Sequence, residues 1–311
     1  MAATSGKPGG IRAAVDKKDN QVKRFRLTFA RYGACAVAWD GRVFVFGGNG
    51  KAGMLGMRPF DLHSMDNVEV IEPGAKTVAP LLWMLSARRY HGAAAVNGYA
   101  YIVGGNTLDG SGATLERVDL RTCKVEQRRS MPTPRFYAAV VESGGLIWVV
   151  GGRGRDGFTG ALEVYDPKRD TWETAPPMPT GRDSTAAVHN GLIHVPGGFA
   201  GQDGLRVYEA YSIREAKWIK QPDLPFPLSA HHVAVVGDTL YSFGDYVEGG
   251  KVAACDLRSG KWHTPRLSEP FVPRRNNAVV AVGNTVVVIG GNTASSSATA
   301  VDTVQVFRLL R

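Results

Sequence analysis

Short apolar runs that end in glycine recur at a regular interval along this 311-residue chain. They end at glycine pairs or a close variant of one: Gly47-Gly48, Gly104-Gly105, Gly151-Gly152, Gly197-Gly198, Gly244-Asp245 and Gly290-Gly291. Successive first glycines are 57, 47, 46, 47 and 46 residues apart. A period of this length that contains strands rather than helices is typical of a β-propeller. The pattern therefore predicts six blades around a common axis.

The third repeat indicates which strands one period contains. Apolar or alternating segments lie at residues 138–141, 146–150 and 161–165, and a further segment begins at Thr171. The turn at residues 166–170 contains aspartate and proline, which favour tight turns. Each repeat is thus predicted to form four antiparallel strands.

Two positions in each repeat, one in the third strand and one in the fourth, are separated by a constant seven residues. These anchor pairs are Ile71 and Val78, Val118 and Val125, Tyr165 and Trp172, Tyr211 and Trp218, and Cys255 and Trp262. A slip of one residue would move every side chain to the other face of the sheet, so a fixed spacing indicates buried positions. Cys255 occupies a tyrosine position, and we interpret it as a core residue.

A glycine pair followed by a tyrosine and then a tryptophan resembles the kelch repeat. The matching positions recur in all six repeats. The resemblance implies an all-β fold, a six-bladed β-propeller with four antiparallel strands per blade. It does not define an activity, because propellers carry many unrelated functions.

The sixth repeat ends before its fourth strand. Its third strand is expected at residues 302–307, whereas residues 21–27 at the other end alternate polar and apolar side chains. We expect this N-terminal strand to complete the last blade and remove an exposed sheet edge. The propeller would then span residues 22–311, after a basic flexible tail at residues 1–21 for which an organellar targeting role stays open.

Charge and cysteine content indicate which partners and which cellular location to expect. The net charge of +9 favours acidic partners, but the basic residues do not form a stripe interleaved with aromatics, so nucleic acid is an unlikely partner. No apolar stretch approaches the ~20 residues of a membrane span. Cys35, Cys123 and Cys255 lack metal-type spacing and predict reduced thiols. We expect a cytoplasmic location, with a nuclear or organellar one as the alternative.

Motifs that suggest catalysis have ordinary structural explanations here. Residues 48–53 and 152–157 fit G-x-G-x-x-G, but a strand rather than a helix follows each, so we interpret both as turns. The seven histidines are scattered, and no motif for a metal or nucleotide is present. We therefore expect no metal, no cofactor and no enzymatic activity.

Arginine recurs at one position of the repeat. Arg31, Arg88, Arg135 and Arg274 lie sixteen residues before the first glycine, and Arg182 lies fifteen before it. Equivalent positions converge on a propeller axis, so a ring of guanidinium groups around one mouth is expected. The alternative is a structural role, with each arginine paired to carbonyl groups or to a neighbouring blade. The doublets Arg88-Arg89 and Arg274-Arg275 favour the first.

In kelch domains that act as substrate adaptors, partners bind at this mouth, through residues beside the arginine and after the glycine pair. Arginines, amides and aromatics in this arrangement suit an acidic protein segment. By resemblance, the partner-binding set is Arg31, Tyr32, Asn49, Arg88, Arg89, Asn106, Arg135, Phe136, Arg153, Arg182, Phe199, His231, Tyr246, Arg274, Arg275 and Asn292.

Two functions compete. The first is a non-enzymatic protein-interaction module or scaffold, a subunit or adaptor of a larger complex. The second is a cofactor-free isomerase of sialic acid, for which Asp183 or Asp245 would be the acid or base. A long loop within residues 49–66 of the first repeat, rich in methionine, is either an adaptable contact surface or a flexible insertion.

Overall fold

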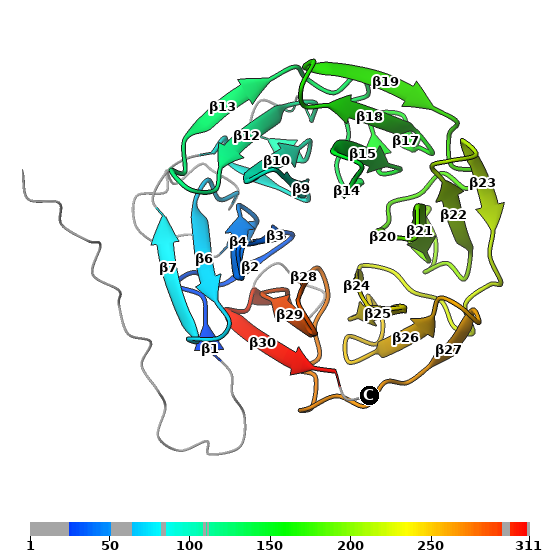
Figure 1. Ribbon diagram of the computed structural model, residues 1–311. Coiled ribbons are helices and arrows are strands. Elements are labelled where there is room, and N and C mark those ends of the chain that lie inside the picture. The colour runs from blue at the N-terminus through cyan, green and yellow to red at the C-terminus, as the bar shows by residue number, and fades with distance from the viewer. Residues whose placement is uncertain are drawn as a thin grey trace, which may run out of the picture.

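The chain is a closed ring of antiparallel sheets around a central axis (Figure 1). The computed structural model describes residues 25–50, 64–81, 85–107, 110, 112–293 and 299–309. The predicted tail at residues 1–21 and most of the long loop of the first repeat lie outside the described residues. Within them the strands form six four-stranded sheets, which are the six predicted blades.

Each blade is a meander in which strands follow one another from the axis outwards. The first three blades are β3 (Cys35–Trp39), β4 (Arg42–Phe46), β6 (Val68–Glu72) and β7 (Thr77–Leu81); β9 (Gly92–Val96), β10 (Tyr99–Val103), β12 (Leu115–Asp119) and β13 (Val125–Arg128); and β14 (Ala139–Ser143), β15 (Leu146–Val150), β18 (Leu162–Asp166) and β19 (Thr171–Ala175). The last three are β20 (Ala187–His189), β21 (Leu192–Pro196), β22 (Tyr208–Ser212) and β23 (Lys217–Lys220); β24 (His232–Val236), β25 (Thr239–Phe243), β26 (Val252–Asp256) and β27 (Lys261–His263); and β28 (Ala278–Val282), β29 (Thr285–Ile289), β30 (Thr303–Arg308) and β1 (Phe25–Arg26).

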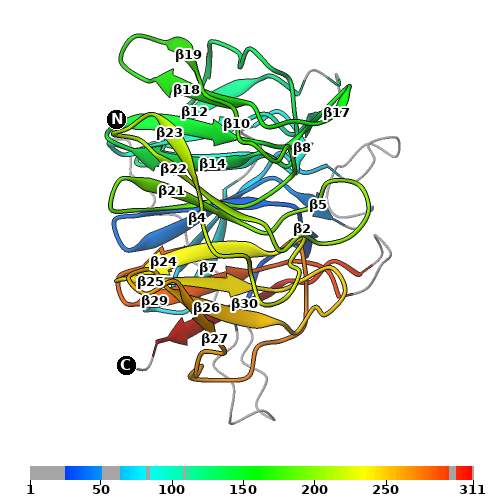
Figure 2. The same ribbon diagram turned by 90° about the vertical axis from the view of Figure 1, so that its right-hand side faces the viewer.

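Short two-stranded ribbons project from one face of the ring (Figure 2). They comprise β2 (Arg31–Tyr32) with β5 (Asn49–Gly50), β8 (Arg88–Arg89) with β11 (Asn106–Thr107), and β16 (Arg153–Gly154) with β17 (Gly157–Phe158). The segment 152–157 therefore forms the turn of a hairpin, as predicted, and does not begin a helix. Residues 51–53 of the other such segment lie outside the described residues. These ribbons form the mouth of the propeller.

The seven-residue spacing of the anchors is the register of each outer hairpin. Tyr165 is paired directly with Trp172, and the same pairing joins Ile71 to Val78 and Cys255 to Trp262. Cys255 is completely buried. Its assignment as a core residue is confirmed.

The core lies between blades rather than within them. Six clusters of buried apolar side chains are present in the described residues, and each joins two neighbouring blades. In β29, Val286 and Val288 pack against blade 5, whereas Val287 and Ile289 pack against blade 1. Both faces of the inner strands are thus buried, which explains why their sequences read as continuous apolar runs rather than alternating ones.

The N-terminal strand closes the ring, as predicted. Phe25 and Arg26 pair with Val304 and Thr303, so β1 is the outermost strand of the sixth blade (Figure 1). Phe25 and Leu27 are buried with residues of blades 1 and 6. The closure covers the edge of β30 that would otherwise be free to pair with another chain.

The first glycine of each pair lies against the backbone of the next blade. Gly151 has a φ of 60°, and a Cβ there would lie 2.5 Å from the carbonyl oxygen of Arg182. The same contact joins Gly290 to the carbonyl of Arg31 across the seam. Both the left-handed conformation and the close approach require glycine, which explains the repeat that first indicated the fold.

Candidate functional site

The five arginines of the repeat are buried in the blades, not exposed at the mouth. Their exposed fractions are 0–1%. In blade 3, Arg135 Nη1 lies 2.6 Å from Glu163 Oε2, and Arg135 Nε donates to the Gly151 carbonyl at 2.8 Å. The expectation of an accessible guanidinium ring is therefore wrong for Arg31, Arg88, Arg135, Arg182 and Arg274.

The physical reason is a carboxylate two residues before the third-strand anchor. Glu69, Glu116, Glu163 and Glu209 occupy this position, and each forms an ion pair with the arginine of its own blade. Burial lowers the pKa of the Arg135 guanidinium, while Glu163 raises it and offsets part of the effect. Blades 1 to 4 thus each contain a charge-assisted clamp between the segment that leads into the first strand and the third strand, which we call the Arg–Glu clamp.

Blades 5 and 6 depart from this clamp in different ways. In blade 6, Gln305 replaces the glutamate and its Oε1 accepts from Arg274 Nη2 at 2.8 Å. In blade 5 both partners are lost together, because Leu228 and Ala253 occupy the equivalent positions and are buried. The substitution is paired, so no unpartnered charge is left inside the blade.

A second ring, two residues after the arginine position, surrounds the axis itself. Main-chain hydrogen bonds link its members in order: Asn276 N to Ala230 O, Gly33 N to Asn276 O, Tyr90 N to Gly33 O, Tyr137 N to Tyr90 O and Ser184 N to Tyr137 O. We call these six residues the axial hoop. No corresponding bond joins Ser184 to Ala230 among the described residues, so the hoop is open between blades 4 and 5.

Most hoop residues have a left-handed backbone. The φ angles of Tyr90 and Tyr137 are both 55°, which is unusual for aromatic residues. Gly33 also has a positive φ, and a Cβ there would lie 2.6 Å from the Tyr90 ring. Glycine at position 33 therefore leaves space for Tyr90 at the axis.

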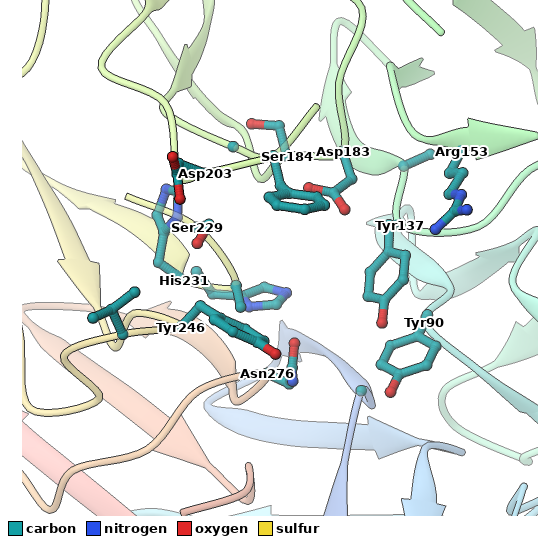
Figure 3. A pocket seen from close by; sticks show the side chains of 18 of the residues that line it. Tyr90, Tyr137, Arg153, Asp183, Ser184, Asp203, Ser229, His231, Tyr246 and Asn276 are labelled. Atoms are coloured by element: carbon teal, nitrogen blue, oxygen red, sulfur yellow. The ribbon is translucent and has the colours of Figure 1, made fainter. Parts of the chain in front are cut away.

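A pocket of about 460 Å³ opens above the hoop at the mouth. Figure 3 shows Tyr90 and Tyr137 on one side of it and Tyr246 on the other, with Asp183 and Arg153 towards one end and Asn276 at the opposite end. The Tyr90 and Tyr137 ring centroids are 4.1 Å apart. We call this space the mouth pocket; its volume is in the range of small-ligand and peptide-anchor sites.

Four of the expected site residues line this pocket: Arg153, Phe199, His231 and Tyr246. The others lie behind or beside it. Tyr32 and Asn49 are buried and hydrogen-bonded to each other, and Asn292 accepts from Asn276 Nδ2 at 3.1 Å.

Of the remaining predicted residues, three pack against aromatic side chains that line the pocket, and one lies away from it. The Arg275 guanidinium lies 3.8 Å from the centroid of the Tyr246 ring, and Arg89 lies 5.8 Å from that of Tyr90. The Phe136 ring packs 5.3 Å from that of Tyr137, whereas Asn106 is exposed and does not line the pocket.

The rim of blade 5 is held by an aspartate in the second position of its glycine pair. The Asp245 carboxylate accepts from Ser229 N at 2.9 Å, and from Val247 N and Glu248 N at 3.0 Å. Tyr246 and Val247 are exposed by 55% and 84%. A fixed loop therefore presents an aromatic and an aliphatic side chain at the pocket edge.

The part of the chain that matches a known family comprises the first three blades and the two inner strands of the fourth. Residues 20–198, more than half of the chain, match the family model of the KLHDC2/KLHL20/DRC7 Kelch-repeats domain. The chain belongs to the Kelch-repeat family. No curated protein matches it significantly. Kelch propellers typically serve as protein-interaction modules and generally have no catalytic activity.

Burial shifts the titration of several groups in this Kelch pocket. It raises the pKa of Asp183 to about 7, against the opposing effects of the Phe199 main-chain N–H and of Arg153. Burial lowers the pKa of both His231 and His232 to about 4, so their imidazoles are neutral at pH 7. The two imidazoles therefore add no positive charge to the pocket at neutral pH, where Asp183 is partly ionised.

Among the described residues of this Kelch chain, no three histidine, cysteine, aspartate or glutamate side chains group as a metal site would require. No helix formed by them has the length and apolarity to cross a membrane.

Tyr90, Tyr137 and Asn276 are pocket residues that the sequence pattern did not select. Each lies two positions after a Kelch-repeat arginine, whereas the expected set extended only one position beyond it. The spacing that identified the arginines could have identified these residues too, because every repeat places that position on the axis.

Proposed function

We propose that this Kelch propeller is a non-enzymatic interaction module that binds a segment of a protein partner in the mouth pocket, as a subunit or adaptor of a larger complex. The observation that carries the proposal is the pocket with its aromatic walls and the exposed pair Tyr246 and Val247 at its edge. Large aromatic residues that are fixed in place are enriched among binding hot spots. The hydrogen bonds of Asp245 to the loop and the packing of Arg275 on the Tyr246 ring fix the position of Tyr246 before a partner binds.

An acidic side chain of the partner would bind Arg153. This exposed guanidinium lies 5.3 Å from the Phe158 ring, and it is the arginine of the expected set that lines the pocket. A hydrogen bond to a charged group contributes about 1.5–3 kcal/mol. Binding of an acidic segment would therefore depend on one arginine, Arg153, rather than on a ring of arginines.

Affinity capture from cells with charge-reversed variants tests the proposal. Arg153→Glu should lose the specific partners of the wild type, whereas Arg155→Glu, at an exposed arginine of the same hairpin outside the pocket, should retain them. Tyr246→Ala should weaken the same interactions. If all three variants capture the partners of the wild type, the mouth pocket is not the binding site.

The isomerase alternative has one supporting observation, the carboxyl of Asp183 with a pKa near neutrality in a pocket. A turnover assay with sialic acid separates the two functions. Isomerisation that Asp183→Asn abolishes would establish the enzyme. Absence of turnover in a protein that binds its partner supports the interaction module.

A further inference from the structure

The charges inside the mouth pocket differ from those expected of a basic site. Asp183 and Asp203 line it together with one arginine, Arg153. No salt bridge to another described residue occupies either carboxylate, and the main-chain N–H of Phe199 is the hydrogen-bond donor that acts on Asp183. Because a carboxylate accepts several hydrogen bonds, both groups can accept more.

A buried imidazole adds a hydrogen-bond acceptor. His231 is 4% exposed, and its Nε2–H donates to the Pro196 carbonyl at 3.1 Å. Because a carbonyl only accepts, the proton of the neutral ring is on Nε2 and Nδ1 carries a lone pair. Nδ1 has no hydrogen-bond partner among the described residues. A buried polar atom without a partner indicates an absent donor.

The aromatic walls suit a positive charge. Tyr90 and Tyr137 face Tyr246 across the pocket, with Asp183 towards one end (Figure 3). Aromatic faces attract cations, and the attraction increases when water is excluded. A desolvated carboxylate at the end of such a slot adds a counter-ion.

We propose that the mouth pocket receives a lysine side chain of the partner, with its ammonium group between the tyrosines and Asp183. This rests on the proposed function and specifies the segment further, as one with a lysine beside its acidic residue. In the free protein Arg153 is the cation that acts on Asp183. A partner carboxylate at Arg153 would leave Asp183 to the lysine, so the two contacts would assist each other.

Probe binding measured by saturation-transfer NMR tests the assignment without knowledge of the partner. The probe is n-butylammonium, which has the chain and charge of lysine, and its neutral control is butan-1-ol. The wild-type protein should bind the ammonium at least fivefold more tightly than the alcohol. Asp183→Asn should abolish that preference, and Asp156→Asn, at an exposed carboxylate outside the pocket, should preserve it.

Two further measurements make the test strict. Tyr246→Leu keeps an apolar side chain at an exposed position and should reduce the preference for the ammonium severalfold. Lowering the pH from 8 to 6 should reduce it as well, because Asp183 takes up a proton near pH 7. The other ionisable groups that line the pocket are Arg153, Asp203, His91, His231, His232, Tyr90, Tyr137 and Tyr246. The three histidines have pKa values lowered by burial to about 3 or 4, so they stay neutral in this range.

Equal binding of ammonium and alcohol, or an unchanged preference in Asp183→Asn, would overturn the lysine assignment. Tighter binding of methylguanidinium than of n-butylammonium would overturn it too, because the group would then be an arginine. The proposed function survives these results if the Arg153→Glu variant still fails to capture the partners of the wild type. The proposed function fails, independently of the lysine assignment, if Arg153→Glu captures those partners although the wild-type pocket binds the ammonium.

Discussion

Glu163 Oε2 lies 2.6 Å from Nη1 of Arg135, and both side chains are almost fully withdrawn from water. The pair connects the entry of blade 3 to its third strand, and three further blades contain the same pair. It makes the repeat arginine a part of the scaffold.

Removing the carboxylate should be strongly destabilising. Glu163→Ala leaves the Arg135 guanidinium buried without its counter-ion, and we expect a loss of about 3–5 kcal/mol in the free energy of unfolding. Glu163→Gln should cost clearly less, because blade 6 uses Gln305 in the same position. Glu173→Ala, on the exposed face of the adjacent strand, is the control. Chemical denaturation measures all three, and equal losses for Ala and Gln would contradict the argument.

Removing both charges should be milder than removing one. Blade 5 contains Leu228 and Ala253 where the other blades place the arginine and the carboxylate or amide. Arg135→Leu combined with Glu163→Ala should therefore unfold at a higher temperature than Glu163→Ala alone. A double-mutant cycle gives the coupling between the two positions. Additive effects of the single changes would show that the clamp does not act as a unit.

The seam between the chain ends should control folding. Deleting residues 1–29 removes β1 and the buried side chains Phe25 and Leu27, so the edge of β30 is left bare. We expect loss of cooperative thermal unfolding, whereas deletion of residues 1–18 should change the melting temperature little. Leu27→Ala should fall between the two, with a loss of about 2–5 kcal/mol. A stable, monomeric protein without residues 1–29 would contradict the closure.

Protonation of Asp183 should be visible in stability. Its carboxyl has a pKa of about 7 in the folded chain and about 4 when unfolded, so the folded state binds more protons between these pH values. Its contribution to stability is present at low pH and is lost as the pH rises through 7. Asp183→Asn should therefore gain melting temperature relative to the wild type from pH 4 to pH 8.

The comparison with Asp183→Asn at each pH removes the effect of the buried histidines. Burial lowers the pKa of His231 and His232, so they destabilise the fold on acidification, with the opposite sign. A difference in melting temperature between variant and wild type that does not change with pH would show that Asp183 titrates normally.

The fold could be predicted because its determinants are periodic. The glycine pairs mark contacts between blades, and the seven-residue spacing from Tyr165 to Trp172 is the register of an outer hairpin. Both features depend on neighbours a short distance along the chain. Closure by residues near Phe25 followed from the same repeat, since one strand was missing from the last blade.

The site was predicted only in part, because it depends on the direction in which each side chain points as well as on its position in the repeat. Arg135 is near the axis, as its spacing indicates, but its side chain turns into the blade towards Glu163. The glutamates had a regular spacing of their own, which would have assigned the arginines to the core. The shifted pKa of Asp183 has no such signal, since it arises from burial in the assembled pocket.

Because the axial hoop is held by main-chain hydrogen bonds, those bonds do not depend on which side chains its residues carry. Six equivalent places accordingly carry glycine, two tyrosines, serine, alanine and asparagine. A propeller built from similar repeats can in this way carry an asymmetric binding surface. The side chains that determine selectivity can change in evolution while the main-chain hydrogen bonds around the axis are kept.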